Sequence, residues 1–345
     1  MAKIWQWADA LLFYSHLAVG VAKKRLQVQS RSPILSALSM YPRLYRRRFA
    51  LISLVVLVAG CGSTPPTRVK VQPLVVAPPA PSKKIRIGIA LGGGAARGFA
   101  HIGVIKALEA QGIYPEIVVG TSAGSVVGAM YAAGNNGFAL QKIAMDMDEA
   151  TISDWALPLF GKSSGVLKGE ALQAYVNRAV RNVTIEKLKL KFGAVATDLN
   201  SGQPILFARG NTGQAVRASS SVPSVFQPVV IGGKSYVDGG LVAPVPVRFV
   251  REMGADFIIA VNISTQADAQ TAVSSVQVLL QTFAIMGQRL NHYELKDADI
   301  VIQPALAKMG GNDFAGRNRA IMAGEEAAAA MMPQIKAKLK ARQQP

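Results

Sequence analysis

From residue 85 onward, short runs rich in β-branched residues alternate with segments whose apolar residues recur at helical spacing. The first run covers residues 85–91 and ends in glycines, and Ile102, Ile105 and Leu108 then share one face of an expected helix over 99–110. Apolar strands separated by helices predict an α/β fold with a central, mainly parallel sheet covered on both faces. The other expected strands are 116–120, 192–197, 204–208, 228–231, 235–237, 257–263 and 300–303, and the other expected helices are 123–133, 169–181, 245–253, 273–295 and 317–341.

The net charge of +18 is unevenly distributed along the chain. Residues 1–60 carry nine Lys or Arg and one acid, which leaves +10 for the rest. Within this stretch three arginines at 46–48 precede the uncharged residues 49–60, the order of a basic region and an apolar run in an export signal. We therefore interpret residues 1–60 as a leader and signal peptide. Export and the lack of a recognised binding motif disfavour nucleic acid as a partner.

The sequence Val58-Ala59-Gly60-Cys61 resembles the bacterial lipobox. The resemblance implies that Cys61, the only cysteine, becomes the lipidated first residue of an exported lipoprotein anchored to the cell envelope. Glycine at the next position implies the outer membrane, with the protein facing the periplasm. The alternative is a buried strand or helix that ends in an inert thiol. Residues 61–84 are expected to be the anchor and a Pro-rich linker.

Residues 1–39 precede the region in which a signal peptide is expected. Because signals begin near the N-terminus, we expect translation to start at Met40. The alternative is that residues 4–21, rich in aromatic and aliphatic side chains, form a further membrane-associated segment.

A glycine-rich segment, GGGAARG at residues 92–98, lies between the first expected strand and helix. Glycines at such a junction allow a sharp turn and leave amide hydrogens free to bind an anion at the helix start. A dinucleotide-binding loop is disfavoured, because one glycine of its pattern is missing and the next strand ends in Gly120 rather than in an acid. Arg97 would oppose the helix dipole, which predicts a compensating anion or a salt bridge.

The segment GTSAG at residues 120–124 places Ser122 where the second expected strand gives way to a helix. A serine flanked by glycines at this junction is typical of a nucleophile elbow, a tight turn that exposes the serine hydroxyl. The alternative is a serine that caps a helix between two glycine turns.

The segment Asp238-Gly239-Gly240 follows an expected hairpin, and by itself it is a common turn. A serine nucleophile needs a base, however, and His101 and His292 are the only histidines after residue 60. Their positions favour a helix-end hydrogen bond for His101 and a solvated or core-edge role for His292.

Together the three segments resemble the patatin-like phospholipase family, over most of residues 85–305. Residues 90–105 and the stretch from Arg217-Ala218-Ser219 through Pro223, Phe226 and Pro228 extend the resemblance. It implies a three-layer α/β/α fold and a Ser-Asp dyad that works without histidine. By position, the catalytic residues are Ser122 and Asp238, and the oxyanion-hole amides are those of Gly93, Gly94 and Ala95. The supporting motif residues are Gly92, Arg97, Gly98, Gly120, Gly124, Gly239 and Gly240.

Ala95 departs from the family pattern, in which many members have glycine. Alanine still supplies an amide hydrogen, so the oxyanion hole is expected to form unless this position needs a positive φ. Residues 306–345 are expected to be a helical extension to the family domain.

The activity implied by the resemblance is hydrolysis of carboxylic esters of phospholipids or lysophospholipids through an acyl-enzyme. Membrane lipids would be the substrate, and no metal or other cofactor is expected. One alternative is a Ser122-Asp238-His292 triad of the α/β-hydrolase type, and another is a non-catalytic lipid-binding lipoprotein. Residues 155–160 (WALPLF) are either an apolar lip over the site or a packed loop. The basic residues from 336 to 342 favour a solvated helix face over a lipid-binding patch.

Overall fold

The computed structural model describes residues 84–147, 167–264, 274–306 and 309–343. The chain divides into two units, Met1–Val75 and Val76–Pro345, and every described residue belongs to the second. The expectations for the leader, the signal peptide, Cys61 and residues 155–160 concern segments outside the described residues.

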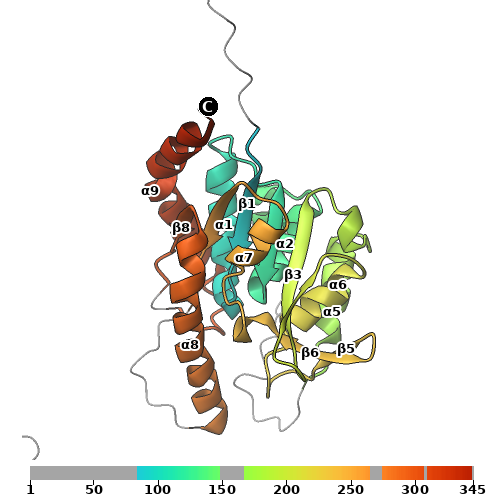
Figure 1. The fold of residues 1–345 in the computed structure, drawn as a ribbon. Helices are drawn as coiled ribbons and strands as arrows, with labels where there is room; N and C mark the ends of the chain where they lie inside the picture. Colours follow the sequence, from blue (N-terminus) through green and yellow to red (C-terminus); the bar gives the residue numbers. More distant parts are fainter. Residues whose placement is uncertain (1–83, 148–166, 265–273, 307–308, 344–345) are drawn as a thin grey trace, which may run out of the picture. The chain divides into compact units, whose positions relative to one another are not determined.

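An eight-stranded sheet lies at the centre of the described fold (Figure 1). Its strand order is β5-β6-β3-β2-β1-β7-β8, with β4 also paired to β3. The neighbours from β3 to β8 along this order run parallel, whereas β4, β5 and β6 add antiparallel pairs. The expected mainly parallel sheet is therefore confirmed. The strands are β1 Ile87–Leu91, β2 Ile117–Thr121, β3 Lys191–Asp198, β4 Pro204–Phe207, β5 Val229–Ile231, β6 Lys234–Asp238, β7 Phe257–Val261 and β8 Ile300–Ile302.

Helices cover both faces of the sheet, so the fold is the expected three-layer α/β/α arrangement. Alternate residues of the buried strands point to opposite faces, and each face therefore has its own apolar cluster. In Figure 1, α7 and α8 lie in front of the sheet and α1 and α2 lie behind it. No helix within the described ranges combines the length and the hydropathy needed to cross a bilayer. The α-helices are α1 Phe99–Glu109, α2 Ala123–Ala132, α3 Gly137–Met145, α5 Glu170–Ala179, α6 Thr212–Ser219, α7 Val247–Glu252, α8 Ser275–Glu294 and α9 Arg317–Gln343.

Helices α3 and α6 are absent from the elements expected from apolar periodicity. Both are short, and each begins after an asparagine whose side chain accepts a backbone hydrogen bond. The Asn136 side chain accepts from the Ala139 amide at 2.9 Å, and the Asn211 side chain accepts from the Gln214 amide at 2.7 Å. Such caps stabilise a helix start locally, without a long apolar stripe.

The last helix, α9, packs closely against α1. A Cβ on Gly103 would lie 1.9 Å from the carbonyl oxygen of Ile321, and a Cβ on Gly324 would lie 2.0 Å from that of Ala100. The two backbones can approach this closely only because both positions are glycine. With Ile321 and Ile335 buried, α9 forms part of the domain core.

Replacing Gly324 by alanine is expected to lower the free energy of unfolding by about 1–3 kcal/mol, because the added methyl group overpacks the contact between α1 and α9. Urea denaturation followed by circular dichroism measures this change. Ala330→Ser, at an exposed position of the same helix, is the control and should stay within about 0.5 kcal/mol of the unchanged protein. A Gly324→Ala protein as stable as this control would contradict the close packing.

Candidate active site

Ser122 occupies the turn between β2 and α2, with a φ of 52° and a ψ of −123°. A positive φ is uncommon for a residue that carries a Cβ, and it marks a sharply bent backbone. The turn also needs its glycines: a Cβ on Gly120 would lie 2.4 Å from the Gly124 backbone, and one on Gly124 would lie 2.1 Å from the Leu91 carbonyl oxygen. Ser122 is partly exposed although the residues on both sides are buried. This is the geometry of a nucleophile elbow.

A second serine, Ser219 at the end of α6, holds the bent backbone at Ser122 through a hydrogen bond. The Ser122 amide donates to Ser219 Oγ at 2.9 Å, and that hydroxyl donates to the carbonyl oxygen of Val195 at 2.6 Å. Ser219 is completely buried at the end of α6. The sequence pattern includes Ser219 but assigns it no role, because the bond joins residues 97 positions apart. We infer that Ser219 fixes the orientation of the elbow.

The glycine-rich loop lies directly beside Ser122. A Cβ on Gly93 would lie 3.2 Å from Ser122 Cβ. The Gly92 amide donates to Val261 at 3.1 Å and the Gly93 amide to Pro244 at 2.9 Å, which ties the loop to β7 and to the segment before α7. Among the described residues, by contrast, the amides of the next two positions, Gly94 and Ala95, have no acceptor. Two adjacent free amides are the donors an oxyanion hole requires.

Ala95 has a φ of 50°, so this position does require the left-handed region. An alanine there costs roughly 1–2 kcal/mol relative to right-handed backbone. The neighbouring Ala96 amide donates to Gly311 at 3.0 Å, and this bond anchors the strained turn. The amide of residue 95 is therefore presented in the same way as that of a glycine would be, at some cost in stability.

Asp238 ends β6, and β3 lies between this strand and β2, the strand that leads to Ser122. Asp238 pairs with Ala196 of β3, while Val195 of the same strand pairs with Thr121. Gly239 allows the close approach, because a Cβ there would lie 2.1 Å from the Val195 carbonyl oxygen and 3.2 Å from Thr121 Cγ2. The structure thus brings Asp238 and Ser122 to the same edge of the sheet.

The carboxylate of Asp238 is buried and only partly satisfied by hydrogen bonds. Oδ1 accepts from the Gly240 amide at 2.7 Å, whereas Oδ2 has no hydrogen-bond partner in the described part of the chain. Burial raises the pKa of Asp238 to about 6, opposed by the hydrogen bond from Gly240 and by the nearby Ser122 side chain. Burying a carboxylate with one unpaired oxygen costs free energy. In a catalytic base, however, the raised pKa and the unpaired oxygen both favour accepting a proton.

His101 is fully buried and holds the glycine-rich loop. Its Nε2 lies 2.8 Å from the Gly92 carbonyl oxygen, and it must donate because a carbonyl only accepts. Burial lowers the pKa of His101 to about 4, so the ring is neutral at pH 7. This bears out the expected hydrogen-bonding role near a helix start. The Nδ1 atom has no partner among the described residues.

The Arg97 side chain also holds the glycine-rich loop in place, through hydrogen bonds to two backbone carbonyls. Its Nε donates to the Ile263 carbonyl at 3.0 Å and its Nη1 to the Met309 carbonyl at 3.4 Å. Burial lowers the pKa of Arg97 to about 10, which leaves the guanidinium charged at neutral pH. The guanidinium thus binds two backbone carbonyls in place of the expected anion or salt bridge. No described carboxylate pairs with Arg97. The positive charge of Arg97 remains near the loop.

Gly98 allows the end of the loop to approach α2 closely, because a Cβ there would lie 2.8 Å from the Cβ of Ala123.

His292 lies on α8 with an exposed side chain. Its ring packs edge-on against Tyr293, with 5.3 Å between the ring centroids. No histidine in the described ranges contacts Ser122 or Asp238, so the geometry gives no support to a triad. Likewise, no three potential metal ligands gather among the described residues, and the expected lack of a cofactor stays a prediction.

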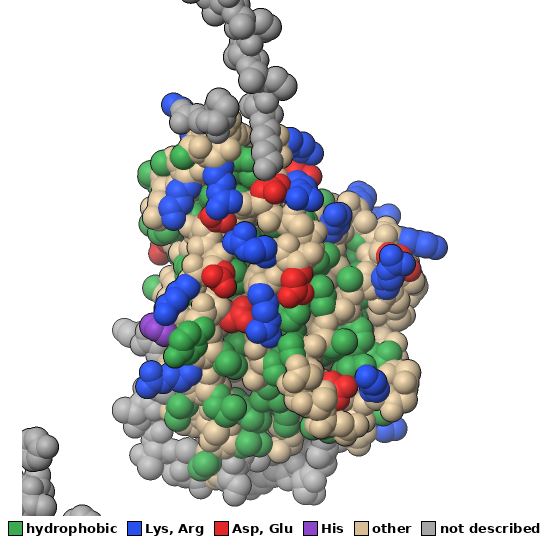
Figure 2. Space-filling view, in the orientation of Figure 1, with side chains coloured by type: hydrophobic (Ala, Val, Ile, Leu, Met, Phe, Trp, Pro, Cys, Tyr) green, Lys and Arg blue, Asp and Glu red, His purple; other side chains and the backbone are tan. Residues whose placement is uncertain are grey.

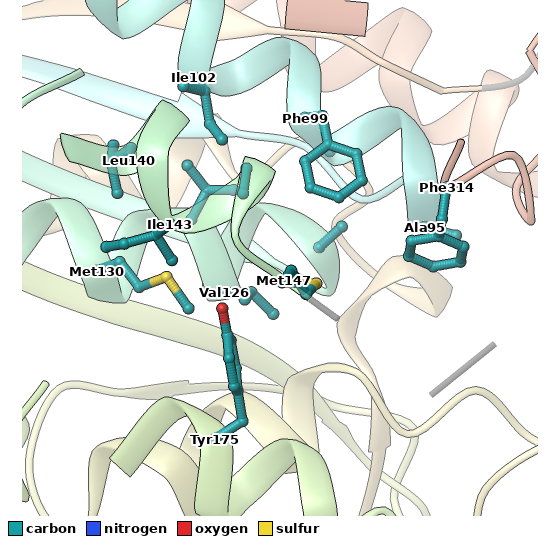
Figure 3. A pocket seen from close by; sticks show the side chains of 14 residues that line it. Ala95, Phe99, Ile102, Val126, Met130, Leu140, Ile143, Met147, Tyr175 and Phe314 are labelled. Carbon is teal, nitrogen blue, oxygen red and sulfur yellow. The ribbon is translucent and has the colours of Figure 1, made fainter. Parts of the chain in front are cut away.

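An apolar cavity begins beside the loop and the elbow (Figure 3). It holds about 450 Å³ of space, part of which is open to solvent. Ala95, whose amide is free, lines one end, and Met130, Leu140 and Ile143 lie farther in. Ala123, the neighbour of Ser122 in the chain, is also a lining residue. Among the described lining residues, Tyr175 contributes one hydroxyl and the other side chains are apolar. The apolar character of this lining suits a hydrocarbon chain.

The basic residues near the C-terminus attach α9 to its surroundings. Lys336 donates to the Gln111 side chain and Lys338 to the Asp299 carbonyl, each at 2.7 Å, and Arg342 bonds to the Asp299 carboxylate. Three of the basic side chains are therefore engaged by the domain itself. This agrees with a helix face and not with a free lipid-binding patch.

Comparisons with known proteins show a similarity to one family over the region that contains this site. The model of the patatin-like phospholipase family matches residues 89–251, a stretch that contains Ser122 and Asp238. An uncharacterized NTE family protein of Mycobacterium tuberculosis is 38% identical over 184 residues, which are 53% of this chain and 50% of that protein. Lysophospholipase NTE1 of Coccidioides immitis is 35% identical over 184 residues, which are 53% of this chain and 12% of that one. The chain thus matches half, or much less, of the length of these relatives.

Among solved structures, VipD from Legionella pneumophila is similar with a TM-score of 0.46 and 14% identity, over 73% of this chain and 68% of that one. The family match covers the glycine-rich loop, the elbow serine and the Asp-Gly-Gly segment. Residues 89–251 of this chain match the patatin-like phospholipase family.

Proposed function

We propose that this protein is a serine hydrolase that cleaves carboxylic ester bonds of phospholipids or lysophospholipids. The observation that carries the proposal is the meeting of three features at one edge of the sheet: a strained serine elbow, a buried carboxylate with a free oxygen, and two unoccupied amides. Each suits one requirement of acyl transfer, namely a nucleophile, a base and an oxyanion hole.

The reaction would start when Ser122 Oγ attacks the ester carbonyl carbon. Asp238 Oδ2 accepts the hydroxyl proton, and the amides of Gly94 and Ala95 bind the negative charge that develops on the carbonyl oxygen. The Gly93 amide is left out of this oxyanion hole, because Pro244 already occupies it. Ser122 precedes the first turn of α2, whose dipole further favours the negative charge.

The intermediate then expels the alcohol, which takes the proton from Asp238 and leaves the acyl group on Ser122. In the second half, Asp238 accepts a proton from water as the water attacks the acyl carbon. The bond from this carbon to Ser122 Oγ then breaks, the serine oxygen takes the proton back from Asp238, and the fatty acid is released. The cavity behind Ala95 and Ala123 would hold the acyl chain throughout. A lipid substrate is further supported by the fungal relative, which is named a lysophospholipase.

The proposal is tested by incubating the full chain with a panel of phospholipids, lysophospholipids and p-nitrophenyl esters of increasing chain length. Release of fatty acid from at least one lipid, with a preference for acyl chains long enough to fill the cavity, is expected. A protein that binds lipids but releases no fatty acid from any of them would favour the alternative of a non-catalytic lipid-binding lipoprotein.

The rate should depend on pH through the carboxylate of Asp238. A base must be ionised, so activity towards a soluble ester is expected to rise with pH around the pKa of about 6 and to level off above it. Below that pKa, each unit of pH should lower kcat by about tenfold. A pH–rate profile measured with p-nitrophenyl butyrate checks this, and a rise centred near pH 8 would point to a different base.

Substitution of His292 distinguishes the dyad from a triad. Because His292 is exposed and packs against Tyr293, His292→Ala should change kcat/KM for a soluble ester by less than about twofold, as a surface substitution does. A triad histidine would instead cost several orders of magnitude. A collapse of activity in a folded His292→Ala protein would overturn the dyad.

We further propose that the enzyme is exported and anchored to the cell envelope through a lipid on Cys61, at the outer membrane and facing the periplasm. The lipobox-like residues 58–61 and the Pro-rich stretch after them support this location. Metabolic labelling with a radioactive fatty acid should mark the protein, and Cys61→Ser should remain unlabelled.

A further inference from the structure

The first half of α8 is uncharged and rich in apolar residues, and none of its described side chains is buried. Residues 275–288 contain no charge, and every residue from 277 to 286 is exposed or half-exposed. Val278, Ile285 and Met286 are exposed by 52%, 49% and 49%. These positions face outwards, where an ordinary surface helix carries polar side chains. Between residues 277 and 286, the other apolar residues are half-buried, namely Leu279, Leu280, Phe283 and Ala284.

This half of α8 lies at the same edge of the sheet as Ser122. α8 follows β7, whose carboxyl end is at that edge because β7 is parallel to β1 and β2. In Figure 1, α8 runs along the front of the sheet and reaches beyond its lower end. Gly287 is where close packing begins, since a Cβ there would lie 3.4 Å from Pro244, the residue that accepts the Gly93 amide.

The second half of α8 has a different composition. Exposed Arg289 and His292 follow the apolar half, and Tyr293 is exposed by 69%. Just beyond the helix, exposed Lys296 lies 5.2 Å from the Tyr293 ring centroid and is followed by exposed Asp297. The acid in this stretch of the helix, Glu294, is buried and paired with Arg248 at 2.8 Å. Figure 2 shows charged side chains gathered mostly over the upper part of this face and apolar ones over the lower part.

We propose that residues 277–286 insert into a lipid surface and hold the Ser122 edge of the sheet against it. An uncharged helix half followed by an aromatic and basic belt matches the layers of a membrane interface, with acyl chains below and anionic headgroups above. The inference rests on the proposed lipid substrate, which a docked enzyme would draw from the same surface.

The direct test reports on the location of α8 without needing catalysis. In the full chain with Cys61→Ser, a single cysteine is introduced as Ile285→Cys or, for the control, as Tyr114→Cys, and an environment-sensitive fluorophore is attached. Tyr114 is 60% exposed and lies before β2, at the opposite edge of the sheet. On addition of phosphatidylglycerol–phosphatidylethanolamine vesicles, the label at 285 should shift to the blue and be quenched by acyl-chain quenchers, and the label at 114 should not.

A second measurement connects insertion with turnover. The double variant Val278→Asp/Ile285→Asp should lose about tenfold or more of its activity on these vesicles, because two charges oppose burial in the interface. Its kcat for p-nitrophenyl butyrate should be unchanged, as should its thermal unfolding. Tyr114→Asp should behave like the unchanged protein in every assay.

The two proposals fail in different ways. If the unchanged chain hydrolyses no ester but the label at 285 still enters the bilayer, the proposed function fails and the docking surface stands. If the label at 285 behaves like that at 114, the docking proposal is overturned. It is also overturned if the label shifts without vesicles in a chain that sediments as a dimer, since a second copy then covers α8.

Discussion

Replacing Ser122 by alanine is expected to lower hydrolysis of p-nitrophenyl butyrate by at least about 10⁴-fold, because the atom that forms the acyl-enzyme is removed. The fold should remain intact, since the Cβ is retained and the Ser122 amide still donates to Ser219. Initial rates at pH 7.5, with enzyme concentration checked by absorbance, measure the loss.

Two further variants make this result specific. Ser201→Ala, at an exposed turn, controls for the loss of a serine hydroxyl and should retain full activity. Ser122→Gly should be as inactive as the alanine variant, yet more stable than it, because glycine adopts a φ of 52° without strain. Activity retained in Ser122→Ala would place the nucleophile elsewhere.

Replacing Asp238 by asparagine should have the second largest effect on catalysis. The amide keeps the size of the carboxylate and can still accept from the Gly240 amide, but it cannot accept the serine proton. A loss of about 10³–10⁴-fold in kcat is expected, comparable to that of other carboxylates in serine hydrolase sites. Because the substrate contacts remain, KM for a short ester should change little.

The same substitution should stabilise the protein at neutral pH. The folded-state pKa of Asp238 is raised to about 6 from 3.8. Below pH 3.8 the group is protonated in both states, and as the pH rises to 6 the folded state increasingly bears the cost of an ionised buried carboxylate. Asp238→Asn removes that cost, so the free energy of unfolding at pH 7.5 should rise by roughly 1–3 kcal/mol.

Urea denaturation at pH 4 and pH 7.5 separates this effect from ordinary packing changes. The stability difference between Asp238→Asn and the unchanged protein should be large at pH 7.5 and small at pH 4. An inactive but less stable Asp238→Asn protein would mean that the carboxylate supports the fold, and its role as a base would need another argument.

The turns that carry Ser122 and Asp238 could be predicted from the sequence, because the residues that shape each turn are close together in the chain. Strand, turn and helix follow one another around Ser122, and the glycines needed at 120 and 124 lie within two residues of it. The Asp-Gly-Gly segment is local in the same sense, since Asp238 accepts from its own turn at Gly240. Short-range patterns of this kind are visible without a structure.

Features that depend on contacts between distant residues could not be predicted in this way. The Gly93 amide is occupied by a carbonyl from residue 244, and only this contact limits the proposed oxyanion hole to the next two amides. The cavity likewise combines Ala95, Tyr175 and Phe314. Apolar periodicity predicts a helix over 273–295, which corresponds to α8. The exposure of α8, however, depends on where the sheet ends.

The most direct test of the account is to trap the nucleophile. The full chain is incubated with a fluorophosphonate carrying a long alkyl chain, and its peptides are analysed by mass spectrometry. We expect one adduct, on Ser122, that forms with the same pH dependence as hydrolysis and is absent from Ser122→Ala. An adduct on another residue, or an unlabelled Ser122 in a protein that hydrolyses esters, would contradict the account.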